Sequence, residues 1–558
     1  MGKLRLALLL VACCGCGQLA LAQSSKSLPP ALDLDAGAYP ESGPDPLTPA
    51  PPNTTPLLAP GSNATLGESA PAADADPIVL AVRERLAGST ASRGNGGEAD
   101  TAALKAFYAQ RTAPLWFAND AFTSRAQAAV AEIGQADSWG LQAAAFDLPQ
   151  PAEAMATVEA RAAAELKLSV AVLSYARAAR GGRLDPAAVS RKFDQKPPVY
   201  DPGSLLLAIA EHPDVAAYLR QLNPRHAQFA RLRQALLDAR ARPGEAGNAS
   251  TVRRLIANME RWRWLPDDLG DFYVWDSVPD QMTRVVDREE VTLAEKIVVG
   301  KPSTPTPIFS ANMQFVIFHP SWGVPAGMKV EELWPQLRNT GGGWFSSYPL
   351  ASTVLAGHGL YVSRGGHPIN PDAVDWSSAD IRQFEFTQPP GPKNVLGIVK
   401  FRFPNKHDVY MHDTPERHLF GGAVRAFSHG CMRVQNPVRL ATVLLAHDKG
   451  WSANEVEGYV RRGGEIALSK PIPVHVTYFT AVADEAGKVQ YFPDIYGLDD
   501  RVASALEGAR VSLGPGPEAA QPKAARGGGS ETPRVSSRSL AKRKPPETKN
   551  PLTAIFFN

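Results

Sequence analysis

Apolar residues recur at two different spacings along this chain, and the spacing changes near residue 270. From about 78 to 250 the sequence is rich in Ala, Leu and Arg, and its apolar residues have helical spacing. The stretch 153–180 predicts one long helix, which Gly181-Gly182 ends before the next element starts at Leu184. The pattern predicts an all-helical domain over 78–250. Because this domain carries no obvious chemistry, we interpret it as a scaffold.

From about 271 the apolar runs become β-branched or aromatic and are bounded by Gly and Pro, which is typical of strands. Four such runs stand out: 272–275, 297–299, 315–318 and 474–478. We expect a mostly β domain over 251–480, followed by an extension over 481–510. A helix is predicted after Asn436, because Pro437 suits a first helical turn and helical spacing follows it. The predicted fold class is therefore α+β.

A Gly-rich insertion at 324–381 interrupts the β pattern. Its glycines predict a mobile flap, because Gly costs the most entropy to order. Four tryptophans lie in or beside the flap: Trp322, Trp334, Trp344 and Trp376. They either cover a bound substrate or pack a small core of the flap itself.

Both ends of the chain have the composition of processed or disordered segments. Residues 1–22 combine a basic start, a short apolar run and an Ala-Leu-Ala site, which predicts a cleavable export signal. The competing interpretation is a lipoprotein signal with a lipid on Cys13. The segment 23–77 is Pro-rich and predicts a disordered linker. In the tail 511–558, eight Lys or Arg against three Glu predict a solvated basic segment that can contact anionic envelope polymers weakly.

Composition and charge narrow the functional class. Hydrophobic residues make up 44% of the 558 positions, which is enough for the cores of two or three domains. The net charge of +2, without a strongly basic domain, argues against nucleic-acid binding. No stretch after the first 22 residues is long and apolar enough to read as a transmembrane helix. We therefore expect an exported chain that works in a cell envelope or outside the cell.

One cysteine remains after the expected export signal is removed, and it lies in Ser-His-Gly-Cys-Met-Arg-Val at 428–434. A lone thiol in an exported protein has no partner for an intramolecular disulfide, so Cys431 is either buried and inert or reactive. Four of the eleven histidines fall between 407 and 429. Because an imidazole can generate a thiolate, this context favours a nucleophile.

The residues around the thiol suggest separate roles. His412 lies at a predicted strand end nineteen residues before Cys431, where it can accept the thiol proton and later return it to a leaving amine. Gly430 permits a close turn whose amides can face an oxyanion. Arg433 can hold a substrate carboxylate. The ring of His429 is expected to shape the loop rather than to take part in the chemistry.

A metal site is the competing explanation for these side chains. Possible ligands are His407, His412, His418, His429 and Cys431. However, the chain has no Cys-x-x-Cys, no His-Glu-x-x-His and no second cysteine near them. We therefore favour nucleophilic catalysis without a metal.

Ser-His-Gly-Cys-x-Arg-Val, preceded by Tyr-x-His-Asp-Thr-Pro at 410–415, closely resembles the L,D-transpeptidases of the YkuD-domain family, in particular the large Gram-negative (YcbB-like) type. The resemblance covers about 80–480. Further matching segments are 258–266, 299–302 with 306–307, and 389–397 with 400–401. Large members carry a peptidoglycan-binding module before the catalytic domain, but here only 239–248 occupies that position. The stretch 318–325 also departs from the family pattern.

The resemblance implies an enzyme that forms 3→3 cross-links between diaminopimelate residues of peptidoglycan stems in the periplasm. It implies a thioester on the cysteine, release of D-alanine, no cofactor and covalent inhibition by carbapenems. The expected partners are a donor tetrapeptide stem and an acceptor stem, with no nucleic acid. The implied site consists of Cys431 as nucleophile, His412 as proton donor and acceptor, Gly430 in the oxyanion hole, His429 in the loop structure, and Arg433, Tyr410 and Ser428 in substrate binding.

Other functions remain open at this stage. An L,D-carboxypeptidase or another hydrolase of the same fold would use the same nucleophile with water as acceptor. A wall-binding scaffold without activity is a second alternative, although the intact His412, Gly430, Cys431 and Arg433 argue against it. A papain-like protease is disfavoured, because its cysteine precedes its histidine.

Overall fold

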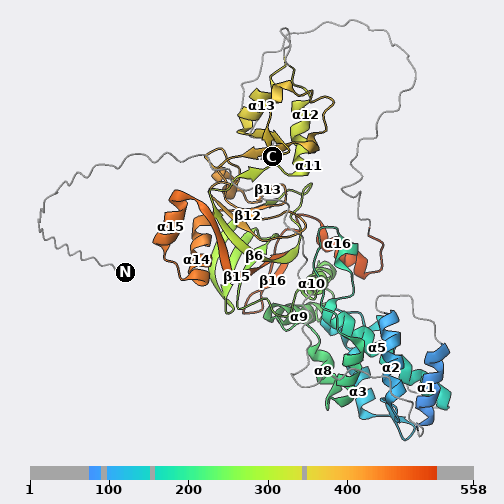
Figure 1. Cartoon of the computed structure of the whole chain (residues 1–558). Helices are drawn as coiled ribbons and strands as arrows, with labels where there is room; N and C mark the ends of the chain where they lie inside the picture. The colour runs from blue at the N-terminus through green and yellow to red at the C-terminus, as the bar shows by residue number, and fades with distance from the viewer. Residues whose placement is uncertain (1–74, 89–96, 151–156, 342–347, 512–558) are drawn as a thin grey trace, which may run out of the picture. The chain divides into compact units, whose positions relative to one another are not determined.

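The computed structural model describes residues 75–88, 97–150, 157–341 and 348–511 (Figure 1). The predicted export signal, nearly all of the linker, the basic tail from residue 512 and Trp344 lie outside these ranges. Within the described ranges, no helix is both long and apolar enough to cross a bilayer.

The N-terminal half of the described chain is helical, as its spacing predicts. The long helix α5 ends at Gly181, and Gly182 follows with a positive φ of 86°, which favours glycine. The domain also contains a short hairpin, so the expectation of helices alone was incomplete. Its elements are α1 (Pro77–Gly88), α2 (Gly97–Gln110), β1 (Phe117–Ala118), β2 (Ala121–Phe122), α3 (Ser124–Gly134), η1 (Ala136–Trp139), η2 (Ala143–Ala145), α5 (Val158–Gly181), α6 (Pro186–Val189), α7 (Pro202–Glu211), α8 (Val215–Gln221) and α9 (Ala227–Arg240).

A buried carboxyl organises the centre of this helical domain. Glu165 on α5 is fully buried and accepts hydrogen bonds from Tyr108 Oη at 2.8 Å and from the Trp116 amide at 2.9 Å. These bonds compensate the cost of burying a polar group. They tie α2 and the loop before β1 to α5, and the surrounding apolar side chains form one core.

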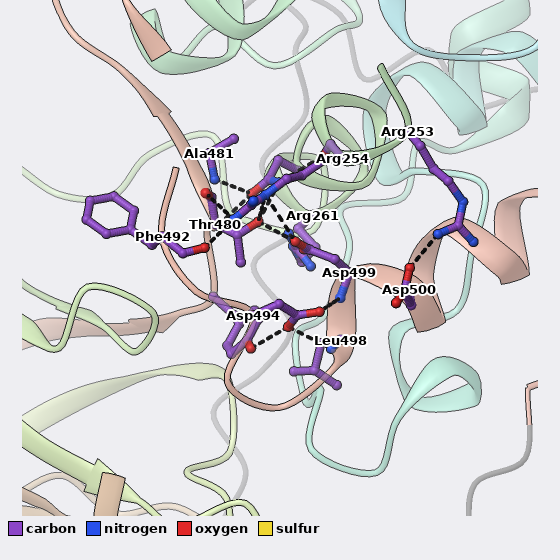
Figure 2. Close-up of polar contacts among 12 residues, drawn as sticks. Arg253, Arg254, Arg261, Thr480, Ala481, Phe492, Asp494, Leu498, Asp499 and Asp500 are labelled. Atoms are coloured by element: carbon purple, nitrogen blue, oxygen red, sulfur yellow. Dashed lines mark hydrogen bonds and ion pairs between the residues drawn. The ribbon is translucent and has the colours of Figure 1, made fainter. Parts of the chain in front are cut away.

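Seven residues, 241–247, join α9 to α10 (Asn248–Trp262), so no inserted module separates these two helices. Helix α10 is held by polar contacts to the C-terminal extension (Figure 2). Arg261 pairs with Asp499 at 2.5 Å, and Arg254 donates to the carbonyl of Thr480 at 2.9 Å. Arg253 pairs with Asp500 at 2.5 Å.

A nine-stranded sheet forms the second half, in the order β13-β5-β14-β12-β11-β6-β15-β3-β4, with an additional pairing of β4 with β5. All four predicted strand runs lie in it, in β3, β5, β6 and β15, and the predicted helix is α14. The elements are β3 (Phe272–Ser277), β4 (Met282–Asp287), β5 (Glu290–Gly300), β6 (Phe309–Phe318), β11 (Val399–Arg402), β12 (Met411–His412), η6 (Arg417–Gly421), β13 (Ala426–Ser428), β14 (Met432–Val434), α14 (Pro437–Lys449), α15 (Ala453–Arg462), β15 (Gly464–Thr477), β16 (Ala481–Ala483), β17 (Val489–Tyr491) and α16 (Leu498–Leu506).

The insertion folds as a small subdomain, which we call the cap and define as residues 322–388 (yellow to orange in Figure 1). It has its own four-stranded sheet in the order β7-β10-β8-β9. Its elements are β7 (Trp322–Gly323), α11 (Ala326–Met328), η3 (Lys329–Leu333), α12 (Trp334–Leu337), α13 (Ala351–His358), β8 (Tyr361–Arg364), β9 (His367–Pro368), η4 (Pro371–Ala373), η5 (Ile381–Gln383) and β10 (Glu385–Gln388).

The cap tryptophans pack inward. Trp322 and Trp376 are buried in the cap core, and Trp334 packs against that core while donating its indole N–H to the Trp376 carbonyl at 2.9 Å. The expectation that these three side chains cover a substrate is therefore wrong. The alternative, a core of the insertion itself, is what the structure has, because β10 pairs with both β7 and β8 and gives the cap a sheet to pack on.

Candidate active site

The pairing of short strands brings the candidate residues together. β12 runs parallel to β14, with Met411 opposite Met432 and His412 opposite Arg433. Side chains alternate across a strand, so the two methionines share the buried face of the sheet. His412 and Arg433 therefore share the opposite face, and Cys431 precedes β14 beside them. The nineteen-residue return that the spacing predicts is present.

The Cys431 side chain is half-buried and packs against the apolar core of the cap. Its Sγ lies 3.9 Å from the backbone carbonyl of Asp408. Burial raises the pKa of the Cys431 thiol to about 11, although the charges of Lys400 and Arg433 act in the opposite direction. The thiol is thus protonated at neutral pH in this state and requires a base.

His412 has the features of that base. Its ring is buried, and Nδ1 lies 2.5 Å from the carbonyl oxygen of Asp413. A carbonyl can only accept, so Nδ1 carries the proton and Nε2 keeps its lone pair. Burial, helped by the Arg433 charge, lowers the pKa of His412 to about 3. The ring is therefore neutral at physiological pH and able to accept a proton.

Asp413 fixes the backbone that orients this ring. Its carboxylate accepts from the Ile398 amide at 2.9 Å and from the Thr414 amide at 2.6 Å, and it pairs with Arg417 at 2.5 Å. Gly397 faces the same carboxylate, and a Cβ on Gly397 would lie 2.4 Å from Asp413 Cγ. Glycine is required there because the carboxylate occupies the space that a side chain needs.

Lys400 is a site residue that our sequence reasoning missed. It lies on β11 opposite His412, and its Nζ sits 4.0 Å from the ring centroid of Tyr410. Tyr410 is buried, and its ring meets the ring of His412 edge to face at 5.7 Å. Burial lowers the pKa of Lys400, and the Cys431 thiolate would raise it. The only sign of Lys400 in the sequence was that 400–401 is one of the segments that resemble the family.

The loop carrying the thiol is held from several sides. Ser428 is buried, and its Oγ donates to the Cys431 carbonyl at 2.6 Å. The Ser428 carbonyl accepts from the Lys301 amide at 2.8 Å and from Thr304 Oγ1 at 3.1 Å. Gly430 has φ of 118°, a conformation that side chains disfavour. In this state Ser428 braces the loop, and its role in substrate binding stays a prediction.

Arg433 is buried and engaged. Its guanidinium donates to Glu416 Oε2 at 2.9 Å. Burial lowers the pKa of Arg433, and Glu416 opposes that effect. To hold a substrate carboxylate, as the sequence predicts, Arg433 would have to share its guanidinium between Glu416 and the ligand or give up Glu416. The sequence did not indicate this ion pair.

His429 contacts the cap. Its Nε2 pairs with Glu332 on η3, and both side chains are largely buried. The structural role expected for His429 stays a prediction. Glu332 is a second residue that the sequence reasoning missed, because it precedes the thiol motif by almost one hundred positions.

The remaining histidines of the metal alternative point elsewhere. His407 pairs with Asp194 at 3.0 Å, and His418 is exposed. Among the described residues, no group of three or more His, Cys, Asp or Glu is arranged to hold a metal. A surface cavity of about 520 Å³ lies at the start of α14, lined in part by Arg417, Gln435 and Arg439. Neither Cys431 nor His412 lines that cavity.

A thiol segment paired with the strand of a histidine of fixed tautomer suits nucleophilic acyl chemistry. Residues 271–456 match the L,D-transpeptidase catalytic domain (YkuD), and residues 102–236 match a scaffold domain. The chain therefore carries an L,D-transpeptidase catalytic domain of the YkuD type behind a scaffold domain. This confirms the family that the thiol motif resembles.

Individual relatives are more distant. A Haemophilus influenzae protein named "Putative L,D-transpeptidase" is 28% identical over 260 residues, which are 46% of this chain and 50% of that protein. The chain thus matches about half the length of this curated relative. Among solved structures, an L,D-transpeptidase from Mycobacterium smegmatis is 14% identical with a TM-score of 0.17, covering 37% of this chain and 58% of that one. The complex of the L,D-transpeptidase LdtMt1 with imipenem has the same identity and TM-score, covering 37% and 59%.

Proposed function

We propose that this chain is a cysteine L,D-transpeptidase that forms 3→3 cross-links in peptidoglycan. The observation that supports it best is the register of β12 and β14, which sets His412 beside the thiol segment while the Asp413 carbonyl fixes its tautomer. Cys431 is the nucleophile and His412 the proton carrier. The donor is a tetrapeptide stem that ends in diaminopimelate and D-alanine.

The reaction has two steps. In acylation, the thiol proton moves to Nε2 of His412 as Sγ bonds to the carbonyl carbon between diaminopimelate and D-alanine. The C–N bond then breaks, the proton passes to the D-alanine nitrogen, and a thioester remains. In the second step, the side-chain amine of an acceptor diaminopimelate attacks the thioester. That amine gives a proton to His412, which returns it to the departing sulfur.

Two features of the resting site bear on these steps. Sγ lies near the Asp408 carbonyl, so the thiol has to turn away from that carbonyl before its proton passes to His412. The developing oxyanion is stabilised by backbone amides at Gly430 and Cys431. Carbapenems acylate the same thiol, because their strained carbonyl mimics the donor. We place the mature enzyme in the periplasm.

The test uses the purified full chain and a muropeptide with a tetrapeptide stem. The expected products are a cross-linked dimer and one D-alanine for each cross-link, measured by liquid chromatography and mass spectrometry. Cys431→Ala should give neither product and no carbapenem adduct. D-alanine release without dimer would show instead a carboxypeptidase of the same fold. An adduct that persists in Cys431→Ala would show that another residue is the nucleophile.

A further inference from the structure

The connection between β5 and β6 lies directly under the thiol loop. The matching segments 299–302 and 306–307 lie at the end of β5 and in this connection, and the proposed chemistry leaves them without a role. Thr306 is fully buried within it. Its Oγ1 accepts a hydrogen bond from the Gly300 amide at 2.9 Å and donates one to the Gly430 carbonyl at 2.9 Å. The hydroxyl is thus fixed on one side and holds the thiol loop on the other.

The carbonyl that Thr306 holds belongs to the peptide unit that contains the Cys431 amide. A trans peptide is planar, and its C=O and N–H point in opposite directions. Fixing the Gly430 carbonyl below the loop therefore fixes the Cys431 N–H above it. Within the described part of the chain, this N–H donates to no other group. It remains available to an oxyanion next to Sγ.

Support for Thr306 comes from Tyr496, near the C-terminus of the described chain. The Tyr496 hydroxyl accepts from the Thr306 amide at 3.2 Å and donates to the Gly300 carbonyl at 2.6 Å. Burial raises the pKa of Tyr496 to about 12, so this hydroxyl keeps its proton. The Tyr496 amide donates to Tyr478 Oη, and that hydroxyl in turn donates to Asp494. Asp494 belongs to the network drawn in Figure 2.

The close packing of this connection leaves little freedom. A Cβ on Gly300 would lie 2.7 Å from the Thr306 nitrogen, so Gly300 has no room for a side chain. An added Cβ at Gly430 would be in ordinary van der Waals contact, 3.8 Å from Val409 Cγ2 and 4.0 Å from Pro305 O, so only the positive φ requires glycine there. The Thr306 hydroxyl is the side-chain group that holds the carbonyl of the Gly430–Cys431 peptide.

We propose that Thr306 is a positioning residue for the oxyanion hole: its hydroxyl orients the Gly430–Cys431 peptide so that the Cys431 amide faces the developing oxyanion. The inference rests on the proposed acyl transfer. It assigns Thr306 no contact with substrate. Without the hydroxyl, the loop keeps its other bonds from Lys301, Thr304 and Ser428, but this one peptide is free to rotate.

The test compares two reactions at the same sulfur. Acylation by imipenem forms an oxyanion, whereas alkylation by iodoacetamide displaces iodide and forms none. Both are followed by mass spectrometry of the full chain. Thr306→Val should lower the acylation rate by about 10–10²-fold, somewhat less than deletion of an oxyanion donor, and should leave alkylation within about twofold. Thr306→Ser, which keeps the hydroxyl, should restore acylation.

The matched control is Thr304→Val, which removes a hydroxyl that contacts the same loop but not this peptide. It should affect both reactions little. Tyr496→Phe serves as a second variant if Thr306→Val folds poorly, and it should also slow acylation more than alkylation. Equal losses in both reactions, or no loss in either, would overturn the inference. A wild-type chain that imipenem does not acylate would instead overturn the proposed function, and the inference with it.

Discussion

His412 donates its Nδ1 proton to the backbone carbonyl of the very next residue, Asp413, at 2.5 Å. The orienting partner of the imidazole is therefore a carbonyl, which cannot take up a proton or a charge. It selects the tautomer and stabilises an imidazolium less than a carboxylate would. Burial disfavours the charged ring as well. The site thus keeps histidine and thiol neutral until a substrate is bound.

We predict that His412→Ala slows acylation of Cys431 by about 10²–10⁴-fold, because a positioned proton acceptor contributes about that factor. The rate of carbapenem adduct formation measures it. The matched control is His418→Ala, which removes an exposed histidine from the same segment. If His429→Ala silences acylation in a folded protein while His412→Ala does not, the two histidines have been assigned in reverse.

We predict that alkylation of Cys431 rises steeply with pH. With a thiol pKa of about 11, the thiolate fraction grows about tenfold for each pH unit between 7 and 9. An ordinary thiol would begin to level off near pH 8.5. Iodoacetamide labelling rates across this range, in the absence of substrate, check the prediction. A rate that levels off near pH 8 would mean that the thiol is far more acidic than its burial implies.

Lys400 should support the thiolate. Replacing it by Met removes the cation over the Tyr410 ring and the positive charge near Cys431, so the thiol pKa should rise further. We expect alkylation at pH 8 to slow by about three- to tenfold, the size of an electrostatic effect at a partly exposed site. Arg402→Met removes a neighbouring charge on β11 as a control and should change the rate less. Equal losses of alkylation rate in the two variants would mean that the thiol responds to the total positive charge of β11 rather than to Lys400 in particular.

The sequence predicted four strands and pointed to Cys431 and His412 as the proposed nucleophile and base, because these depend on local patterns: β-branched runs, a lone cysteine and a spacing of nineteen residues. It could not locate Glu332 or Thr306. Their partners lie in the thiol loop about one hundred residues away, and only the tertiary fold brings them together. The sheet of the cap escaped prediction for a related reason, because β10 pairs with strands that lie far from it in the sequence. The mobility that the glycines indicate stays a prediction.

A buried carboxyl remote from the thiol should make stability depend on pH. Asp276 on β3 is fully buried, and burial raises its pKa to about 7. The folded state therefore binds its proton more tightly than the unfolded state. The stabilisation is complete below about pH 4 and is lost as the pH rises through about 7, with a total of up to about 4 kcal/mol.

Denaturant unfolding at pH 5 and pH 8 measures this effect. Asp276→Asn should flatten the difference between the two pH values, because the amide cannot ionise. Asp271→Asn, at an exposed position just before β3, should leave the difference as in the wild type. If Asp276→Asn keeps the full pH dependence, other groups carry it.

The contact between Glu332 of the cap and His429 of the thiol loop should influence whether water or an amine takes the acyl group. Glu332 lies on η3, whose Leu333 is buried in the cap core, and Cys431 packs against that same core. Glu332→Gln removes the charge that pairs with His429 but keeps the size of the side chain. The cap should then separate more easily from the loop and admit water to the thioester.

We expect the ratio of D-alanine released to cross-linked dimer to rise above one in Glu332→Gln, while the acylation rate by a carbapenem changes less. Glu331→Gln, the exposed neighbour on the same turn, is the matched control and should keep the wild-type ratio. A ratio that stays near one in Glu332→Gln would mean that the cap contact shapes the loop without affecting the choice of acceptor.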